Sequence, residues 1–113
     1  MHELGITENI MDIALDKAKE AQASKISRIN LVVGELSGFV SDCIEFYFEF
    51  LSKDTIAQGA KLYFEPVALQ LRCRSCSMVF HPQDTLWSCP ECQSQSMEVV
   101  GGRELYIESL EVE

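Results

Sequence analysis

The sequence predicts an α/β fold in which a three-stranded sheet carries two helices on one face, with a small cysteine-containing module inserted into the chain. Three observations support this prediction. Apolar residues recur with helical spacing over residues 4–21. Apolar and polar residues alternate in three segments of β character. Two Cys-x-x-Cys pairs stand between the last two of those segments.

The N-terminal part of the chain predicts a helix followed by a strand. Over residues 4–21 no proline interrupts an apolar face made by Leu4, Met11, Ala14, Leu15, Ala18 and Ala21. Residues 27–33 predict a strand with one buried face, because Ile29, Leu31 and Val33 alternate with polar residues. Gly34 and Gly38 bracket the turn that follows.

A second helix is expected to begin near Ser41, which we interpret as its N-cap, and to stop before Gly59. Asp42 is favourable beside the positive end of the helix dipole. The spacing of the apolar residues favours a helix over a strand: Cys43, Ile44, Phe46, Tyr47, Phe50 and Leu51. We interpret Cys43, the odd fifth cysteine, as a small buried apolar residue.

The C-terminal part predicts two more strands around the cysteine module. Residues 62–71 form one strand that bends or lies at a sheet edge, because Pro66 has no amide donor. Residues 104–112 form the last strand. The predicted organisation is a discontinuous α/β domain of residues 1–70 and 98–113, with a second domain of residues 71–97 inserted into it. This insert is too small to fold without a metal.

The strongest chemical signal is the pair of motifs Cys73-x-x-Cys76 and Cys89-x-x-Cys92. Each motif lets two thiolates point at one tetrahedral ion, so the two together predict a four-sulfur, zinc-ribbon-like site. Four thiolates leave no coordination position open, which indicates a structural role. Disulfides are disfavoured because no secretory signal is recognisable. Iron remains an alternative, since the same four thiolates suit a rubredoxin-type centre.

Composition narrows the class of partner. The net charge of −9 repels phosphate backbones, so nucleic acid is not expected as a partner. No apolar run approaches the roughly 20 residues that cross a bilayer, and we expect a cytoplasmic protein without membrane contact. An enzyme fits poorly, because no nucleophile–base motif or phosphate-cradling glycine loop is recognisable. A zinc-ribbon adaptor and a rubredoxin-like electron carrier are the rival interpretations.

His2 directly follows Met1, and together they offer a second metal-binding possibility. The terminal amine, the His2 amide nitrogen and the His2 imidazole can close two chelate rings around Ni(II) or Cu(II) in one plane. The next backbone amide or the Glu3 carboxylate would supply the fourth position. A histidine near a frayed terminus usually has no such role, so this signal is weak by itself.

Several motifs together resemble the HypA/HybF family of hydrogenase-maturation nickel metallochaperones. They occur in one order along essentially the whole chain: Met1-His2-Glu3-Leu4, Gly34-Glu35-Leu36-Ser37-Gly38, Ala57-Gln58-Gly59-Ala60, the paired Cys-x-x-Cys motifs and the tail Ile107–Glu113. The resemblance implies a nickel-binding α/β domain and an inserted domain with structural zinc. It also implies delivery of Ni(II) to the large subunit of [NiFe] hydrogenase, with a GTPase of the HypB type as partner and urease maturation as a further role.

Carried over by residue, the resemblance makes His2 the nickel ligand. Met1 and Glu3 belong to the same site through main-chain nitrogen, and the Glu3 side chain is a further candidate ligand. The resemblance makes Cys73, Cys76, Cys89 and Cys92 the zinc ligands. The remaining histidine, His81, lies between the two cysteine pairs. We interpret it as an exposed hairpin residue or a donor to a cysteine sulfur. Movement of His81 toward the nickel site is the alternative.

Overall fold

A computed structural model describes residues 3–82 and 87–113 of the chain and divides it into two compact units. The first contains the described residues up to Val32, then Gly38–Glu65 and Leu105–Glu113. The second contains Val33–Ser37 and Pro66–Glu104, so the predicted insert of residues 71–97 lies within it. None of the described helices is both long and apolar enough to cross a bilayer.

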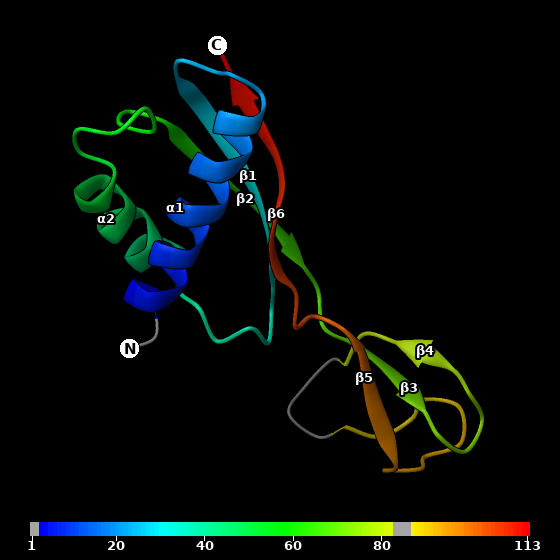
Figure 1. The fold of residues 1–113 in the computed structure, drawn as a ribbon. Helices are drawn as coiled ribbons and strands as arrows, with labels where there is room; N and C mark the ends of the chain where they lie inside the picture. Colours follow the sequence, from blue (N-terminus) through cyan, green and yellow to red (C-terminus); the bar gives the residue numbers. More distant parts are fainter. Residues whose placement is uncertain (1–2, 83–86) are drawn as a thin grey trace. The chain divides into compact units, whose positions relative to one another are not determined.

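The first unit confirms the predicted fold class, since two helices cover one face of a three-stranded sheet (Figure 1). Its strands lie in the order β2-β1-β6. The bounds of these elements are α1 Glu3–Glu20, β1 Ile26–Gly34, α2 Ser41–Leu51, β2 Lys61–Val67 and β6 Leu105–Val112. The arrows in Figure 1 show β2 parallel to β1 and β6 antiparallel to it. Lys25 and Glu113 exchange backbone hydrogen bonds at the start of β1 and the end of β6, as antiparallel pairing requires.

The core of this unit lies between the helices and the central strand. Ile26, Ile29 and Leu31 of β1 are almost fully buried, and so are Ile44 and Phe48 of α2. From α1, the buried residues include Thr7, Ile10, Met11, Ala14 and Ala18. Burying each large aliphatic side chain contributes about 1.5–3 kcal/mol, so apolar packing alone supplies a substantial stabilisation here.

On the face of the sheet that carries no helix, polar and aromatic side chains contact one another across the strands. The Arg28 guanidinium stacks over Tyr63, 4.3 Å from the ring centroid, and its Nε donates to Asn30 at 2.7 Å. The Asn30 amide then donates to the Ser109 hydroxyl at 2.9 Å. These contacts link β1, β2 and β6 and explain why this face of a half-covered sheet is not a continuous apolar surface.

Helix α2 starts as predicted, but the predicted N-cap is wrong. Val40 is the N-cap residue, its own side chain caps nothing, and Ser41 is already helical. The Val40 amide instead donates to the Glu3 carboxylate at 3.3 Å. A carboxylate from the start of α1 thus takes the place of a local capping side chain, which sequence rules for capping do not anticipate.

The second unit contains a three-stranded antiparallel sheet in the order β4-β3-β5, where β3 is Gln70–Cys73, β4 is Val79–Phe80 and β5 is Met97–Gly101. Leu71 lies opposite Phe80 on one side, and Cys73 lies opposite Met97 on the other. The predicted single strand over residues 62–71 is therefore two strands, β2 and β3, interrupted at Ala68 and Leu69. Leu69 is buried at this interruption. The sequence did not predict the break, because apolar and polar residues alternate through residues 62–71 without a clear interruption.

Two glycines permit a close backbone contact in the second unit. A Cβ at Gly34 would lie 2.2 Å from the Gly102 carbonyl oxygen. Gly102 has φ +111°, and a Cβ on it would lie 2.8 Å from the Leu69 Cα. Backbone atoms cannot move aside as a flexible side chain can, so both positions require glycine.

Candidate metal centres

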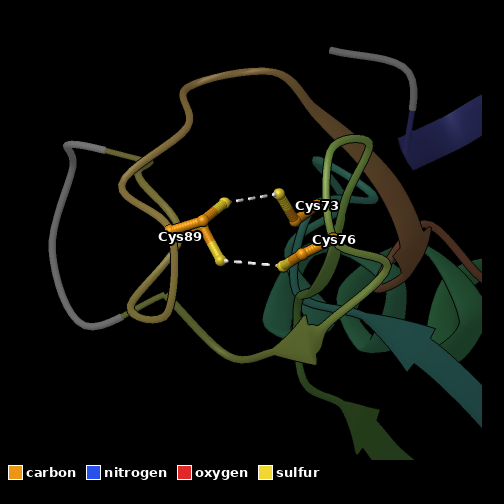
Figure 2. Close-up of side chains that lie close together, drawn as sticks. Cys73, Cys76 and Cys89 are labelled. Carbon is orange, nitrogen blue, oxygen red and sulfur yellow. Dashed lines mark hydrogen bonds between the residues drawn. The ribbon is translucent and has the colours of Figure 1, made fainter.

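The structure brings the four predicted cysteines together at the end of β3. Cys73 is the last residue of β3 and Cys76 follows in a turn, while Cys89 and Cys92 belong to a second turn before β5. Their sulfur atoms all lie within 4.8 Å of one another. Figure 2 shows the sulfurs facing each other across a small gap, and the Cys73–Cys92 and Cys76–Cys89 pairs are each 3.5 Å apart.

The two cysteine turns have the same backbone geometry. In the first, the Cys73 amide donates to the Met78 carbonyl and the Ser77 amide donates back to Cys73. In the second, Cys89 makes the equivalent bonds with Ser94 and Gln93. The fifth residue of each turn is left-handed, with φ of 66° at Ser77 and 61° at Gln93. This repeated arrangement orients both thiols of a Cys-x-x-Cys pair toward one point, which its spacing in the sequence predicts.

The distances suit a tetrahedral ion rather than disulfides. Metal–sulfur bonds of about 2.3 Å place the sulfurs of a tetrahedral site about 3.8 Å apart. The observed pairs at 3.5 Å, within an overall spread of 4.8 Å, bracket that value. A disulfide would require about 2.05 Å, and all of these cysteines are free. The donor set therefore fits one closed four-thiolate centre.

The electrostatics of the cluster also call for a cation. The Cys76 amide, opposed by desolvation and assisted by the Ser75 amide, lowers the pKa of Cys73 to about 6. For Cys76, the Met78 amide acts in the lowering direction, but the neighbouring Cys89 thiol and desolvation raise its pKa to about 12. One thiolate thus suppresses ionisation of the next, and a bound cation would offset that repulsion.

The cluster is also the centre of its unit. Cys73 and Cys89 are buried at 0% and 1% exposure, whereas Cys76 and Cys92 face solvent. Apart from these two cysteines, the buried apolar residues of the described second unit are only Val33, Leu69 and Leu71. So small a core cannot offset the entropy of ordering the chain, and a metal bound by four thiolates would supply the missing stabilisation.

The other predicted centre lies at the N-terminus, where Met1 and His2 fall outside the described residues. Glu3 is described: it begins α1, it is 6% exposed, and its carboxylate accepts the Val40 amide. Its carbonyl oxygen accepts the Thr7 hydroxyl. The third residue of the predicted nickel motif is therefore held in place beside the N-terminus of α2.

The two residues that the sequence left ambiguous have different outcomes. His81 is exposed, as expected, and its Nδ1 lies 2.8 Å from the Leu69 carbonyl oxygen. A carbonyl only accepts, so Nδ1 carries the hydrogen and Nε2 is left for other contacts. The interpretation of Cys43 as buried is wrong, because it is exposed on the outer side of α2. Periodicity identifies the residues that share a helix face but not which of two apolar faces meets the sheet.

The chain is similar to known proteins over essentially its whole length. Residues 1–112 match the family described as hydrogenase/urease nickel incorporation, metallochaperone, hypA. A hydrogenase maturation factor HypA from Dehalococcoides mccartyi strain CBDB1 is 49% identical over 113 residues, covering 100% of this chain and 95% of the relative. The HypA of Caldanaerobacter subterraneus subsp. tengcongensis is 38% identical over 114 residues, with 100% of both chains covered.

Solved structures agree with this match. A solution structure of a HypA protein superposes with a TM-score of 0.77 at 28% identity, covering 99% of this chain and 96% of the other. The solution structure of the Ni metallochaperone HypA from Helicobacter pylori superposes with a TM-score of 0.69 at 27% identity. It covers 99% of this chain and 97% of the other.

Proposed function

The chain belongs to the HypA family of nickel-incorporation metallochaperones, and we propose that it binds Ni(II) at its N-terminus and delivers it during maturation of [NiFe] hydrogenase. The observation that carries this proposal is the family match over residues 1–112, which includes both candidate metal-binding regions. Members of the family are maturation factors and metallochaperones, so the chain is not an enzyme.

We assign nickel binding to His2, with Met1 and Glu3 completing the site. The terminal amine, the His2 amide and the imidazole are joined by short covalent bridges, so they form an in-plane nitrogen chelate that suits Ni(II). Such a chelate needs no rigid pocket. A partner can therefore displace its ligands one at a time, which is the property that a carrier needs for release.

We assign Zn(II) to the four cysteines, as a structural ion. The closed set of thiolates and the small core of the second unit support this role. Iron would fit the same sulfurs, but it would make the protein an electron carrier, an activity for which the family match offers no support. A colourless protein with one equivalent of zinc would distinguish the two.

The partners follow from the same proposal. The family places the chain in the hydrogenase maturation machinery. Within that machinery we propose a GTPase of the HypB type as the protein that works with it, and the precursor of the hydrogenase large subunit as the recipient of nickel. Urease maturation factors are a further set of partners, consistent with the family description. This role would be carried out in the cytoplasm.

Nickel titration of purified protein with its authentic N-terminus tests the proposal. His2→Ala should abolish high-affinity Ni(II) binding, measured by isothermal calorimetry, while zinc content and thermal unfolding stay unchanged. An N-terminal extension should have the same effect, because it removes the free amine from the chelate. The matched control is His81→Ala, which removes the other histidine of the chain and should bind nickel normally.

If His2→Ala binds nickel as the wild type does, the N-terminal assignment is wrong. If His81→Ala abolishes binding as well, the site includes the second unit, and the chelate of residues 1–3 does not account for it. Zinc retained at full stoichiometry after replacement of both Cys73 and Cys92 would contradict the assignment of zinc.

A further inference from the structure

Helix α2 exposes large apolar side chains on the side that faces away from the sheet. Phe46 and Phe50 are 69% and 68% exposed, although Ile44 and Phe48 on the opposite side are buried. Cys43 and Val40 are exposed in line with them, at helical spacing. We call Val40, Cys43, Phe46 and Phe50 the α2 stripe. A helix that is apolar on both sides is expected to be covered on both.

The first unit itself leaves the stripe largely uncovered. Phe46 makes an edge contact with Tyr47 at 5.5 Å between ring centroids. The ammonium of Lys53 lies 5.6 Å from the centroid of Phe50. Neither contact buries a ring, as the exposed fractions show. Adjacent exposed aromatic rings are characteristic of surfaces that bind another protein, where aromatic residues are enriched.

An acidic row runs beside the stripe and restricts what can cover it. Asp42, Glu45 and Glu49 are exposed and follow the same helical spacing one position earlier. The ion pairs found among the described residues involve none of these carboxylates. An occupant would therefore gain from basic side chains along this side. A second copy would bring another row of carboxylates and another net charge of −9, and an anionic lipid surface would be repelled.

The position of the stripe relates it to the N-terminal site. Val40 is the first residue of the stripe, and its amide is bonded to the Glu3 carboxylate at 3.3 Å. Glu3 in turn directly follows the residues proposed to bind nickel. A protein seated on the Val40 end of the stripe would thus lie near Glu3 at the start of α1, the residue that follows the proposed nickel ligands.

From these observations we propose that the α2 stripe is the docking surface for a protein of the hydrogenase maturation machinery that presents an apolar pocket with basic side chains along one edge. Docking on the stripe positions that protein to exchange nickel with residues 1–3. This inference rests on the proposed function for the identity of the cargo. The surface itself is inferred from exposure and charge alone.

The test uses the full-length zinc-loaded protein and two probes from the same genome, the GTPase of the HypB type and the hydrogenase large-subunit precursor. Three variants are compared with the wild type by calorimetry or biolayer interferometry. The double variant Phe46→Ser/Phe50→Ser removes the apolar surface, and Glu45→Lys/Glu49→Lys reverses the acidic row. The matched control is Tyr106→Ser, which removes an aromatic ring that is also 51% exposed but lies on β6.

The phenylalanine variant should weaken binding of at least one probe by tenfold or more, because buried aromatic anchors carry much of an interface's affinity. The lysine variant should also weaken binding, with a smaller dependence of the remaining affinity on salt. Tyr106→Ser should bind like the wild type. Nickel titration and the thermal unfolding midpoint should stay unchanged in all three variants, because every replaced side chain is exposed.

Four results would overturn the inference. The first is that both probes bind the phenylalanine variant as they bind the wild type, and the second is that neither probe binds the wild type. The third is that Tyr106→Ser loses as much affinity as the phenylalanine variant. The fourth is that the phenylalanine changes dissociate a homodimer in sedimentation experiments, which would assign the stripe to a second copy. Unchanged affinity in the lysine variant would refute the basic edge of the partner. A wild-type protein that binds a probe through the stripe but binds no nickel would refute the proposed function and leave the docking surface standing.

Discussion

The two units of this chain are stabilised in different ways. In the first, aliphatic and aromatic residues from two helices and a central strand are buried together, including Ile29, Leu31 and Ile44 at 0–1% exposure. In the described part of the second, two cysteines of the four-sulfur cluster, Cys73 and Cys89, are buried with only a few aliphatic residues. Apolar packing supplies stability wherever enough residues can meet, whereas a unit of this size depends on ligand bonds. The comparison predicts that each unit fails under a different perturbation.

The largest effect should come from breaking the cysteine cluster. Cys73→Ser removes a buried ligand, and structural zinc typically contributes about 10–16 kcal/mol to the folding of such modules. We expect the amide resonances of residues 66–104 to collapse in a heteronuclear NMR spectrum, while those of α1 and α2 stay dispersed. Removal of zinc from the wild type with a chelator should produce the same spectrum. Dispersed resonances for the second unit without metal would show that its apolar residues suffice.

A smaller effect should come from opening a cavity in the first unit. Ile29→Ala removes a fully buried side chain of the central strand and should lower the free energy of unfolding by about 2–5 kcal/mol, measured in urea. Zinc content should not change. The control is Ile13→Ala on α1, because Ile13 is 49% exposed and should cost far less. Equal losses of unfolding free energy in the two variants would mean that Ile29 is not a residue of the core.

The smallest effect concerns pH and separates the two metals. The terminal amine and the His2 imidazole must both be unprotonated to bind nickel, so affinity begins to fall below the ordinary amine pKa of about 7.7–8.0 and falls more steeply below the ordinary imidazole pKa of about 6.5. Zinc competes with protons more strongly than nickel does, because binding by four thiolates typically contributes about 10–16 kcal/mol. Acidification monitored by metal analysis should therefore release nickel before zinc, and the reverse order would contradict the assignment.

Much of this architecture follows from local pattern. The cysteine spacing anticipated the repeated turns, and helical periodicity anticipated α1 and α2. The sequence could not tell which apolar side of α2 meets the sheet, because Cys43, Phe46 and Phe50 look as suitable for burial as Ile44 and Phe48. It also could not anticipate the Glu3–Val40 contact, which joins residues far apart in the chain. Met1 and His2 lie outside the described residues, so their assignment remains a prediction from chemistry and family resemblance.

The Glu3 carboxylate has a consequence for cargo release. Its Oε2 accepts the Val40 amide, and because a carboxylate has two acceptor oxygens, Glu3 could join a nickel ion without losing that bond. The start of α2 and one ligand of the ion would then share a single side chain. A partner that displaced the start of α2 would also displace that ligand, which would favour handing the ion onward over keeping it.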